Sequence, residues 1–395
     1  MQGVDKLKLT SNRMKGFGKF NGARLKSARI YREMTIKELA EKLDVSKQSI
    51  SQYENGLIDP KFEVLLKMIS TLGFPKNYFY EEEKTEIKQG NTYFRASSKM
   101  SKKEEYMHRE KAKLIGNIYN YLNGYIEFPS LNLPDIEESL SIEEKAYKLR
   151  EYWGLGEEPI KDILYIMEKN GIIMSSMYTN SKVVDAFTQP LIIDGKKKYV
   201  VVLGNDKFSA TRRQFSAAHE LAHIILHEDF LEIDNMTREE VRQIEAEAHE
   251  FASAFLLPKI AFSKEVMLYP TNLDYYVELK KKWRTSISAM IVRANRLRII
   301  PQSTYQFLIK KISKDGWRTK EPLDDILIMN QPTVLVRAVD ILLDNNIITE
   351  EELIKELSET EISLNPEEVE TLLGLDNGKL KPKKTESKII EMPLR

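Results

Sequence analysis

Residues 214–228 combine side chains and a spacing that could bind a metal ion and activate a water molecule. They include His219-Glu220-Leu221-Ala222-His223 in an apolar, helix-forming stretch without proline or glycine. On an α-helix of ~3.6 residues per turn, His219 and His223 lie one turn apart on nearly the same face, so both imidazoles can reach one metal ion. Glu220 lies roughly 100° further round the helix. A carboxylate there can take a proton from a metal-bound water.

The distribution of histidine supports a functional interpretation of this pattern. A short motif with few fixed positions also arises by chance in long proteins. The chain has only five histidines, however, and the one outside this region is His108. The others cluster between residues 219 and 249: His219, His223, His227 and His249. This clustering favours a metal site over chance.

Overall composition limits the class of protein and the chemistry of a metal site. The 395 residues are too many for one ordinary core, so two or three domains are expected. Cysteine is absent, so histidine and carboxylate side chains must bind any metal ion. The sequence has no apolar leader and no run of ~20 apolar residues. We therefore predict a soluble, cytoplasmic protein without membrane contact, which the lack of cysteine also fits.

Charge is balanced overall but unevenly distributed. Sixty basic and sixty acidic residues give a formal net charge of zero. Residues 1–50 nevertheless hold twelve Lys or Arg against five Asp or Glu, whereas residues 350–370 hold nine Glu and one Lys. An anionic partner is therefore expected at the N-terminal end only.

Residues 21–82 have the pattern of a helix-turn-helix domain. Thr35 and Glu38 form a capping box at the start of one short helix, and Ser46 can cap the next, which stops at Asn55-Gly56. The segment Ser49-Ile50-Ser51-Gln52-Tyr53-Glu54-Asn55-Gly56, followed by Pro60, resembles the Xre-type DNA-binding domain of phage repressors.

The Xre resemblance implies that the third helix enters the major groove of double-stranded operator DNA. Such domains usually bind paired half-sites, so a homodimer is expected. The alternative is a helical scaffold that has lost DNA binding. The predicted DNA-binding residues are Lys47, Gln48, Ser49, Gln52 and Asn55.

A small antiparallel sheet is predicted immediately before the histidine-bearing helix. The apolar period changes there from 3.6 to about 2, and Asp194-Gly195 is a strong hairpin signal. In a peptidase, an exposed edge strand could hold substrate backbone in extended form beside the metal. The sheet could equally only cover the helix. The strand-like runs are residues 172–177, 183–187, 190–193 and 199–203.

A catalytic zinc site needs a third protein ligand besides the two histidines. The helix predicted over residues 239–257 offers Glu245, Glu247, His249 and Glu250. Spacing alone favours Glu245 or His249 as the ligand, since most glutamates of such a helix are solvated charges.

Three segments of the sequence resemble the ImmA/IrrE family of metallopeptidases. They are Glu245 to Ala252, Leu256-Leu257-Pro258, and Arg213-Gln214-Phe215, which leads into His219. The resemblance implies Zn²⁺ bound by His219, His223 and Glu245, with Glu220 as general base. Where the family usually has Asn or Asp, this chain has His249. The supporting or reserve residues are His249, Glu247, His227 and Tyr178, the last as an oxyanion donor.

Together these features predict a mainly α protein with a small antiparallel sheet, of the α+β class. We expect a DNA-binding regulator and zinc endopeptidase that cleaves a partner repressor of helix-turn-helix type. The alternatives are a regulator that docks a partner without cleaving it, and self-cleavage within residues 81–140. The expected domains are a flexible basic arm (1–20), the helix-turn-helix domain (21–82), a helical connector (83–138), the peptidase domain (139–300) and a C-terminal region without assigned role (301–395).

Overall fold

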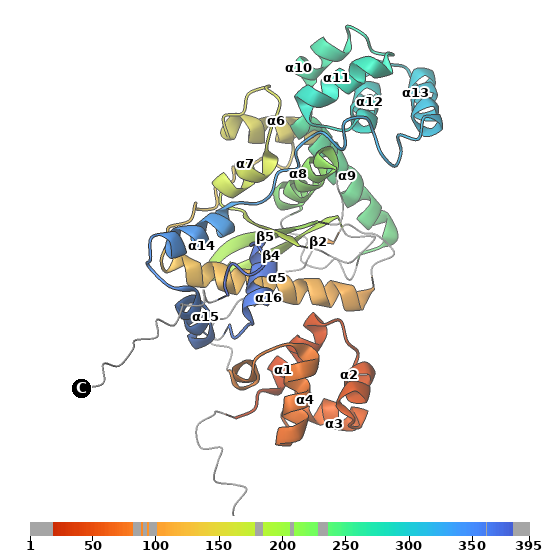
Figure 1. Cartoon of the computed structure of the whole chain (residues 1–395). Coiled ribbons are helices and arrows are strands. Elements are labelled where there is room, and N and C mark those ends of the chain that lie inside the picture. Colours follow the sequence, from red (N-terminus) through yellow and green to blue (C-terminus); the bar gives the residue numbers. More distant parts are fainter. Residues whose placement is uncertain are drawn as a thin grey trace, which may run out of the picture.

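The computed structural model describes residues 19–81, 88–89, 93–94, 101–177, 185–205, 209–227, 236–360 and 362–381. Within these residues the chain is mainly helical with one small sheet, so the predicted fold class is confirmed (Figure 1). The predicted arm, residues 1–20, lies almost wholly outside the described residues. No described helix is both long and apolar enough to cross a membrane.

Short capped helices build the N-terminal domain, as the sequence predicts. Thr35 and Glu38 form the capping box, the Ser46 side chain accepts from the Ser49 backbone, and Gly73 ends the last helix at a φ of 67°. The elements are α1 (Gly22–Tyr31), α2 (Ile36–Leu43), α3 (Lys47–Glu54), α4 (Phe62–Leu72) and the 3₁₀ helix η1 (Lys76–Tyr80). Figure 1 shows α3 on the side of this domain away from the sheet.

The sheet is mixed, which corrects the prediction of an antiparallel one. Strand β4 (Ala186–Ile193) pairs antiparallel with β5 (Lys196–Gly204), whereas β3 (Ile173–Met177) pairs parallel with β5. An alternating pattern shows which residues share a face, but it cannot show strand direction. The predicted hairpin is present, since Asp194 and Gly195 both have positive φ, at 48° and 75°.

On its other side, β4 pairs with two short segments of the connector. These are β1 (Lys88–Gln89) and β2 (Tyr93–Phe94), and both run antiparallel to β4. They lie in the stretch for which only a helical connector was predicted. The sheet order is therefore β1-β4-β5-β3, with β2 also on β4.

Helices cover both faces of the sheet. Helix α8 (Ala210–Leu226) packs on one face and against α9 (Arg238–Leu256), while α5 (Lys102–Asn123) contacts the same strands from the opposite face (Figure 1). The remaining helices of this region are α6 (Ile142–Tyr152), α7 (Ile163–Lys169), α10 (Lys259–Val266), α11 (Leu273–Trp283), α12 (Ile287–Arg296) and α13 (Gln302–Lys314).

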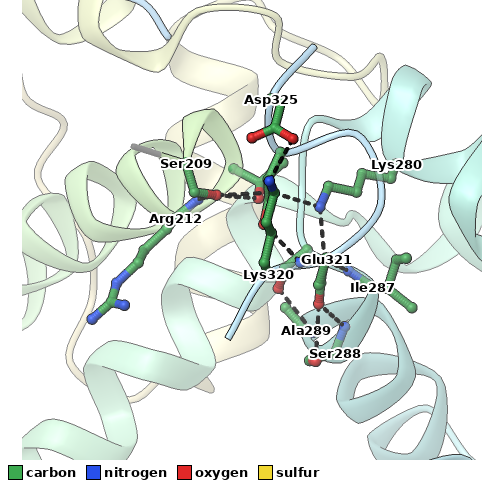
Figure 2. A network of polar contacts seen from close by, with 12 residues as sticks. Ser209, Arg212, Lys280, Ile287, Ser288, Ala289, Lys320, Glu321 and Asp325 are labelled. Carbon is green, nitrogen blue, oxygen red and sulfur yellow. Dashed lines mark hydrogen bonds and ion pairs between the residues drawn. The ribbon is translucent and has the colours of Figure 1, made fainter. Parts of the chain in front are cut away.

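The segment after α13 is anchored by a buried ion-pair network (Figure 2). The fully buried Lys280 donates to Glu321 at 2.9 Å and to Asp324 at 2.7 Å. Glu321 also accepts from the backbone nitrogens of Ile287 and Ser288, at the start of α12. This segment therefore holds α11 and α12 together.

The C-terminal helices return to the sheet and meet the N-terminal domain. They are α14 (Val334–Asp344), α15 (Glu350–Glu359) and α16 (Pro366–Leu373). Their apolar side chains join those of α5 and of the N-terminal helices in one continuous core. Arg32 pairs with Glu368 of α16 at 2.6 Å, and Tyr31 donates to the same carboxylate. The N-terminal domain is thus docked on the C-terminal helix α16.

Candidate metal centre

Helix α8 positions the histidine motif inside the protein. The Ser209 side chain accepts from the Arg212 backbone at its N-terminus, and His227 follows its last residue. His219, Glu220 and His223 are all buried, which is unusual for side chains of this polarity unless they have partners.

Helix α9 brings Glu245 to the two imidazoles. Its first turn is closed by a capping box of Thr237 and Glu240, and the fully buried Ala248 and Ala252 allow it to pack closely on α8. The Nε2 atoms of His219 and His223 lie 3.2 Å apart. The carboxylate of Glu245 lies 3.4 Å from the first of these nitrogens and 3.6 Å from the second.

These distances match the edges of a zinc coordination tetrahedron. With metal–ligand bonds of about 2.0–2.1 Å, neighbouring ligand atoms are separated by about 3.3 Å. Two imidazole nitrogens and a carboxylate oxygen are also a donor set that zinc accepts. Nδ1 of His219 is buried without a hydrogen-bond partner among the described residues. The nitrogen of His219 that lies near His223 and Glu245 is Nε2, so a metal ion would be bound through Nε2 and would not contact this Nδ1.

The protonation state of His223 suits a metal ligand. Burial, together with the nearby imidazoles of His219, His227 and His249, holds the pKa of His223 well below its usual value of 6.5. The ring is therefore neutral at physiological pH and can offer a lone pair.

His227 and Glu247 form a chain of contacts behind His223. Nδ1 of His223 lies 3.1 Å from Nδ1 of His227, whose Nε2 lies 3.1 Å from the Glu247 carboxylate. If protons are donated along this chain towards Glu247, Nε2 of His223 keeps its lone pair on the side of Glu245. His227 and Glu247 therefore lie where they can orient His223, and neither lies among the three converging ligand atoms.

Glu220 is held by a residue that the sequence does not single out. The Thr188 hydroxyl of β4 donates to the Glu220 carboxylate at 2.7 Å, and both side chains are buried. Thr188 falls between the two strand runs predicted at 183–187 and 190–193, which the structure joins into β4. The only feature of the sequence that could have pointed to Thr188 was its position beside an apolar run. Pro190 made a continuous strand through Thr188 difficult to predict.

His249 also belongs to the cluster. One ligand atom each of His219, Glu245 and His249 lies within 4.8 Å of the others, and the ring centroids of His219 and His249 are 4.5 Å apart. Nδ1 of His249 is 2.7 Å from the backbone oxygen of Glu245. Tyr178, predicted as an oxyanion donor, lies outside the described residues.

A cleft of about 650 Å³ lies between the first half of α8, the start of α12 and the segment 317–325, and neither the three proposed ligands nor Glu220 are among its lining residues. Phe215 and Ser216 line it one turn before His219, and the Phe215 ring lies 5.9 Å from that of His249. Phe215 and Ser216 precede His219 by four and three residues, so the cleft borders the same side of α8 as the histidines, one turn away from them.

The predicted DNA-binding residues lie on α3 and at its C-terminal end. Lys47, Gln48 and Asn55 are exposed, while Ser49 and Gln52 are half-buried. Ser49 and Asn55 make local contacts with Ser46 and Ser51. The exposed side chains thus share the surface of a helix that is free of the sheet in Figure 1.

Comparison with known families agrees with both regions. Residues 173–295 match the Peptidase M78 family, described as the IrrE N-terminal-like domain, and residues 25–79 match the helix-turn-helix family. The two resemblances seen in the sequence are therefore confirmed, in the predicted order along the chain.

Among solved structures, the chain is similar to a Mycobacterium tuberculosis transcriptional regulator, with 16% sequence identity and a TM-score of 0.29. The match covers 46% of this chain and 50% of that one, so the chain spans half the length of the solved structure. No curated protein matches the chain.

Proposed function

We propose that the chain is a DNA-binding regulator with zinc-dependent endopeptidase activity. The observation that carries this proposal is the convergence of His219, His223 and Glu245 on one point, with Glu220 beside it. The family match over residues 173–295 supports a metallopeptidase, and the helix-turn-helix match supports DNA binding. A protein that binds operator DNA must be in the compartment that contains the DNA, which supports a cytoplasmic location.

Each residue of the centre has a separate role in the proposed hydrolysis of a peptide bond. His219, His223 and Glu245 would hold zinc, which when bound polarises a peptide carbonyl and lowers the pKa of water. Glu220 takes the proton of the attacking water and later returns it to the leaving amine. Thr188 keeps the Glu220 carboxylate in place through its hydrogen bond of 2.7 Å.

We propose a partner repressor of helix-turn-helix type as the substrate. The DNA-reading domain supports this choice, because it would bring the peptidase to operators at which such repressors are bound and raise their effective concentration. The cleft of about 650 Å³ lined by Phe215 and Ser216, one turn before His219, supports this choice because it offers room for an extended peptide. Since helix-turn-helix readers commonly bind paired half-sites, we also propose a homodimer.

The test is cleavage by the purified protein. We expect wild type with zinc to cut a candidate repressor, and Glu220→Gln to bind the same amount of zinc without cutting it. A Glu220→Gln variant that still cuts the repressor would disprove the mechanism. A wild-type protein that binds the repressor without cutting any candidate would instead support a regulator that docks its partner.

A further inference from the structure

The strand beside Glu220 is paired with a segment of its own chain. In β1 and β2, Gln89 lies opposite Leu191 and Tyr93 lies opposite Thr188, both in antiparallel register with β4. Thr188 is the residue whose hydroxyl holds Glu220. Directly opposed residues of antiparallel strands have Cα atoms about 4.5–5.5 Å apart. The backbone at Tyr93 therefore lies next to Thr188, the residue that hydrogen-bonds the carboxylate proposed to activate water.

This pairing is shorter than that on the other side of β4, because β1 and β2 each contribute only two residues. Strand β4 pairs with β5 in continuous register from Ala186 to Ile193. Towards the linker the register shifts, because three residues separate Gln89 from Tyr93, whereas two separate Leu191 from Thr188. One of those two is Pro190, which has no N–H to donate. Proline within a sheet is confined to edges and bulges, so β4 behaves here as an edge strand to which a peptide has been added.

An added antiparallel strand beside a general base is the arrangement that a peptide substrate needs. It fixes the backbone in extended form and holds a carbonyl near the water-activating group. We infer that the linker of this chain is itself a substrate, cleaved in cis at or next to the Tyr93–Phe94 bond. The inference rests on the proposed peptidase function, and it names a substrate that is always present.

The reaction is hydrolysis and needs no co-reactant other than water. Water gives one proton to Glu220 while its oxygen bonds to the carbonyl carbon of the linker. The C–N bond then breaks, and Glu220 returns the proton to the departing nitrogen. The second proton of the water stays on the new carboxyl group and passes from it to the new amine. The products are an N-terminal fragment that ends in a carboxylate and carries the DNA-reading helices, and a C-terminal fragment that begins with an ammonium group.

Cleavage would change how the DNA reader is attached. The covalent connection through the linker would be lost, and the docking on α16 through Arg32 and Glu368 would remain. The reader could then leave the peptidase body by dissociation alone.

The test follows the intact mass of the full chain incubated with zinc, in parallel with a helix-turn-helix repressor that the same preparation cleaves. We expect two fragments with new ends at or next to Tyr93–Phe94, formed at a first-order rate that does not depend on protein concentration. Glu220→Gln should remain intact. Tyr93→Pro, which removes a backbone donor from the paired strand, should slow the cut at least tenfold, whereas Glu83→Pro, outside β1 and β2, should not.

Several results overturn the inference. A chain that stays intact while the repressor is cut would show that the linker is not a substrate, and the proposed peptidase function would stand. A cut elsewhere in the chain, or equal cutting of a tagged Glu220→Gln chain by wild type in trans, would contradict the register or the cis reaction. If neither repressor nor linker is cut, both proposals fail.

Discussion

At the scale of single residues, the metal centre depends on which nitrogen of each imidazole faces inward. His223 is buried and contacts His227 through Nδ1, which leaves Nε2 directed towards His219 and Glu245. The sequence predicts the converging residues through their spacing on two helices. It could not reveal that Thr188 holds Glu220, because that contact joins a strand to a helix 32 positions away in sequence.

Replacing His227 tests whether this orientation matters. We expect His227→Phe to weaken zinc affinity about 10- to 100-fold, the usual effect of removing a partner behind a metal-binding histidine. The measurement is competition with a chelator of known affinity. As a control, Glu250→Gln changes a partly exposed residue of the neighbouring helix α9 and should leave affinity unchanged. Equal zinc affinity of His227→Phe and wild type would show that the contact with His223 has no role in binding.

At the scale of elements, sequence patterns that depend on neighbouring residues predicted the structure correctly, whereas contacts between distant segments could not be predicted. The capping boxes at Thr35, Ser141 and Thr349 are all formed, because each depends on residues three positions apart. Asn365, which precedes the last helix α16, makes no side-chain cap, because its side chain donates to the backbone oxygen of Gly73, which is distant in sequence. The parallel pairing of β3 with β5 is likewise non-local.

The network around Lys280 is a second long-range feature, and it predicts a large effect on stability. We expect Lys280→Met to destabilise the unit of α11 and α12 by about 3–5 kcal/mol, because Glu321 and Asp324 would remain as buried charges without their cation. The readout is amide hydrogen exchange at Ile287 and Ser288, whose backbone nitrogens donate to Glu321.

The neighbouring lysine supplies the control for that experiment. Lys281 is half-exposed and pairs with Glu278 of its own helix. Lys281→Met should therefore change stability by less than about 0.5 kcal/mol. Similar exchange rates in the two variants would contradict a structural role for the buried network.

At the scale of the whole molecule, the C-terminal helices, for which the sequence indicated no role, contact the N-terminal domain. Tyr31 and Arg32 of the DNA-reading domain share the Glu368 carboxylate of α16, and their apolar neighbours belong to the same core as α14–α16. Periodicity could predict these helices, but no local pattern shows which distant surface a helix covers.

If α16 holds the N-terminal domain, replacement of Glu368 and of the adjacent Glu367 should have different effects on the rate of limited proteolysis. Glu368→Ala should weaken the contact by on the order of 1–2 kcal/mol, because it removes hydrogen bonds to a charged group that is partly screened by solvent. The expected result is faster limited proteolysis between residues 81 and 101. Glu367→Ala should have little effect, since Glu367 pairs with Lys381 at an exposed position. Equal proteolysis of both variants would show that the carboxylate of Glu368 does not hold the domain.

The central claim is that the buried histidine–glutamate centre cleaves a regulatory protein. Its most direct test compares cells that carry wild type with cells that carry Glu220→Gln, and measures the amount of the partner repressor together with the transcripts that it controls. The account predicts that the repressor falls and its transcripts rise in wild type under the inducing condition, while both stay unchanged with Glu220→Gln. Loss of the repressor at the same rate in both strains would contradict it.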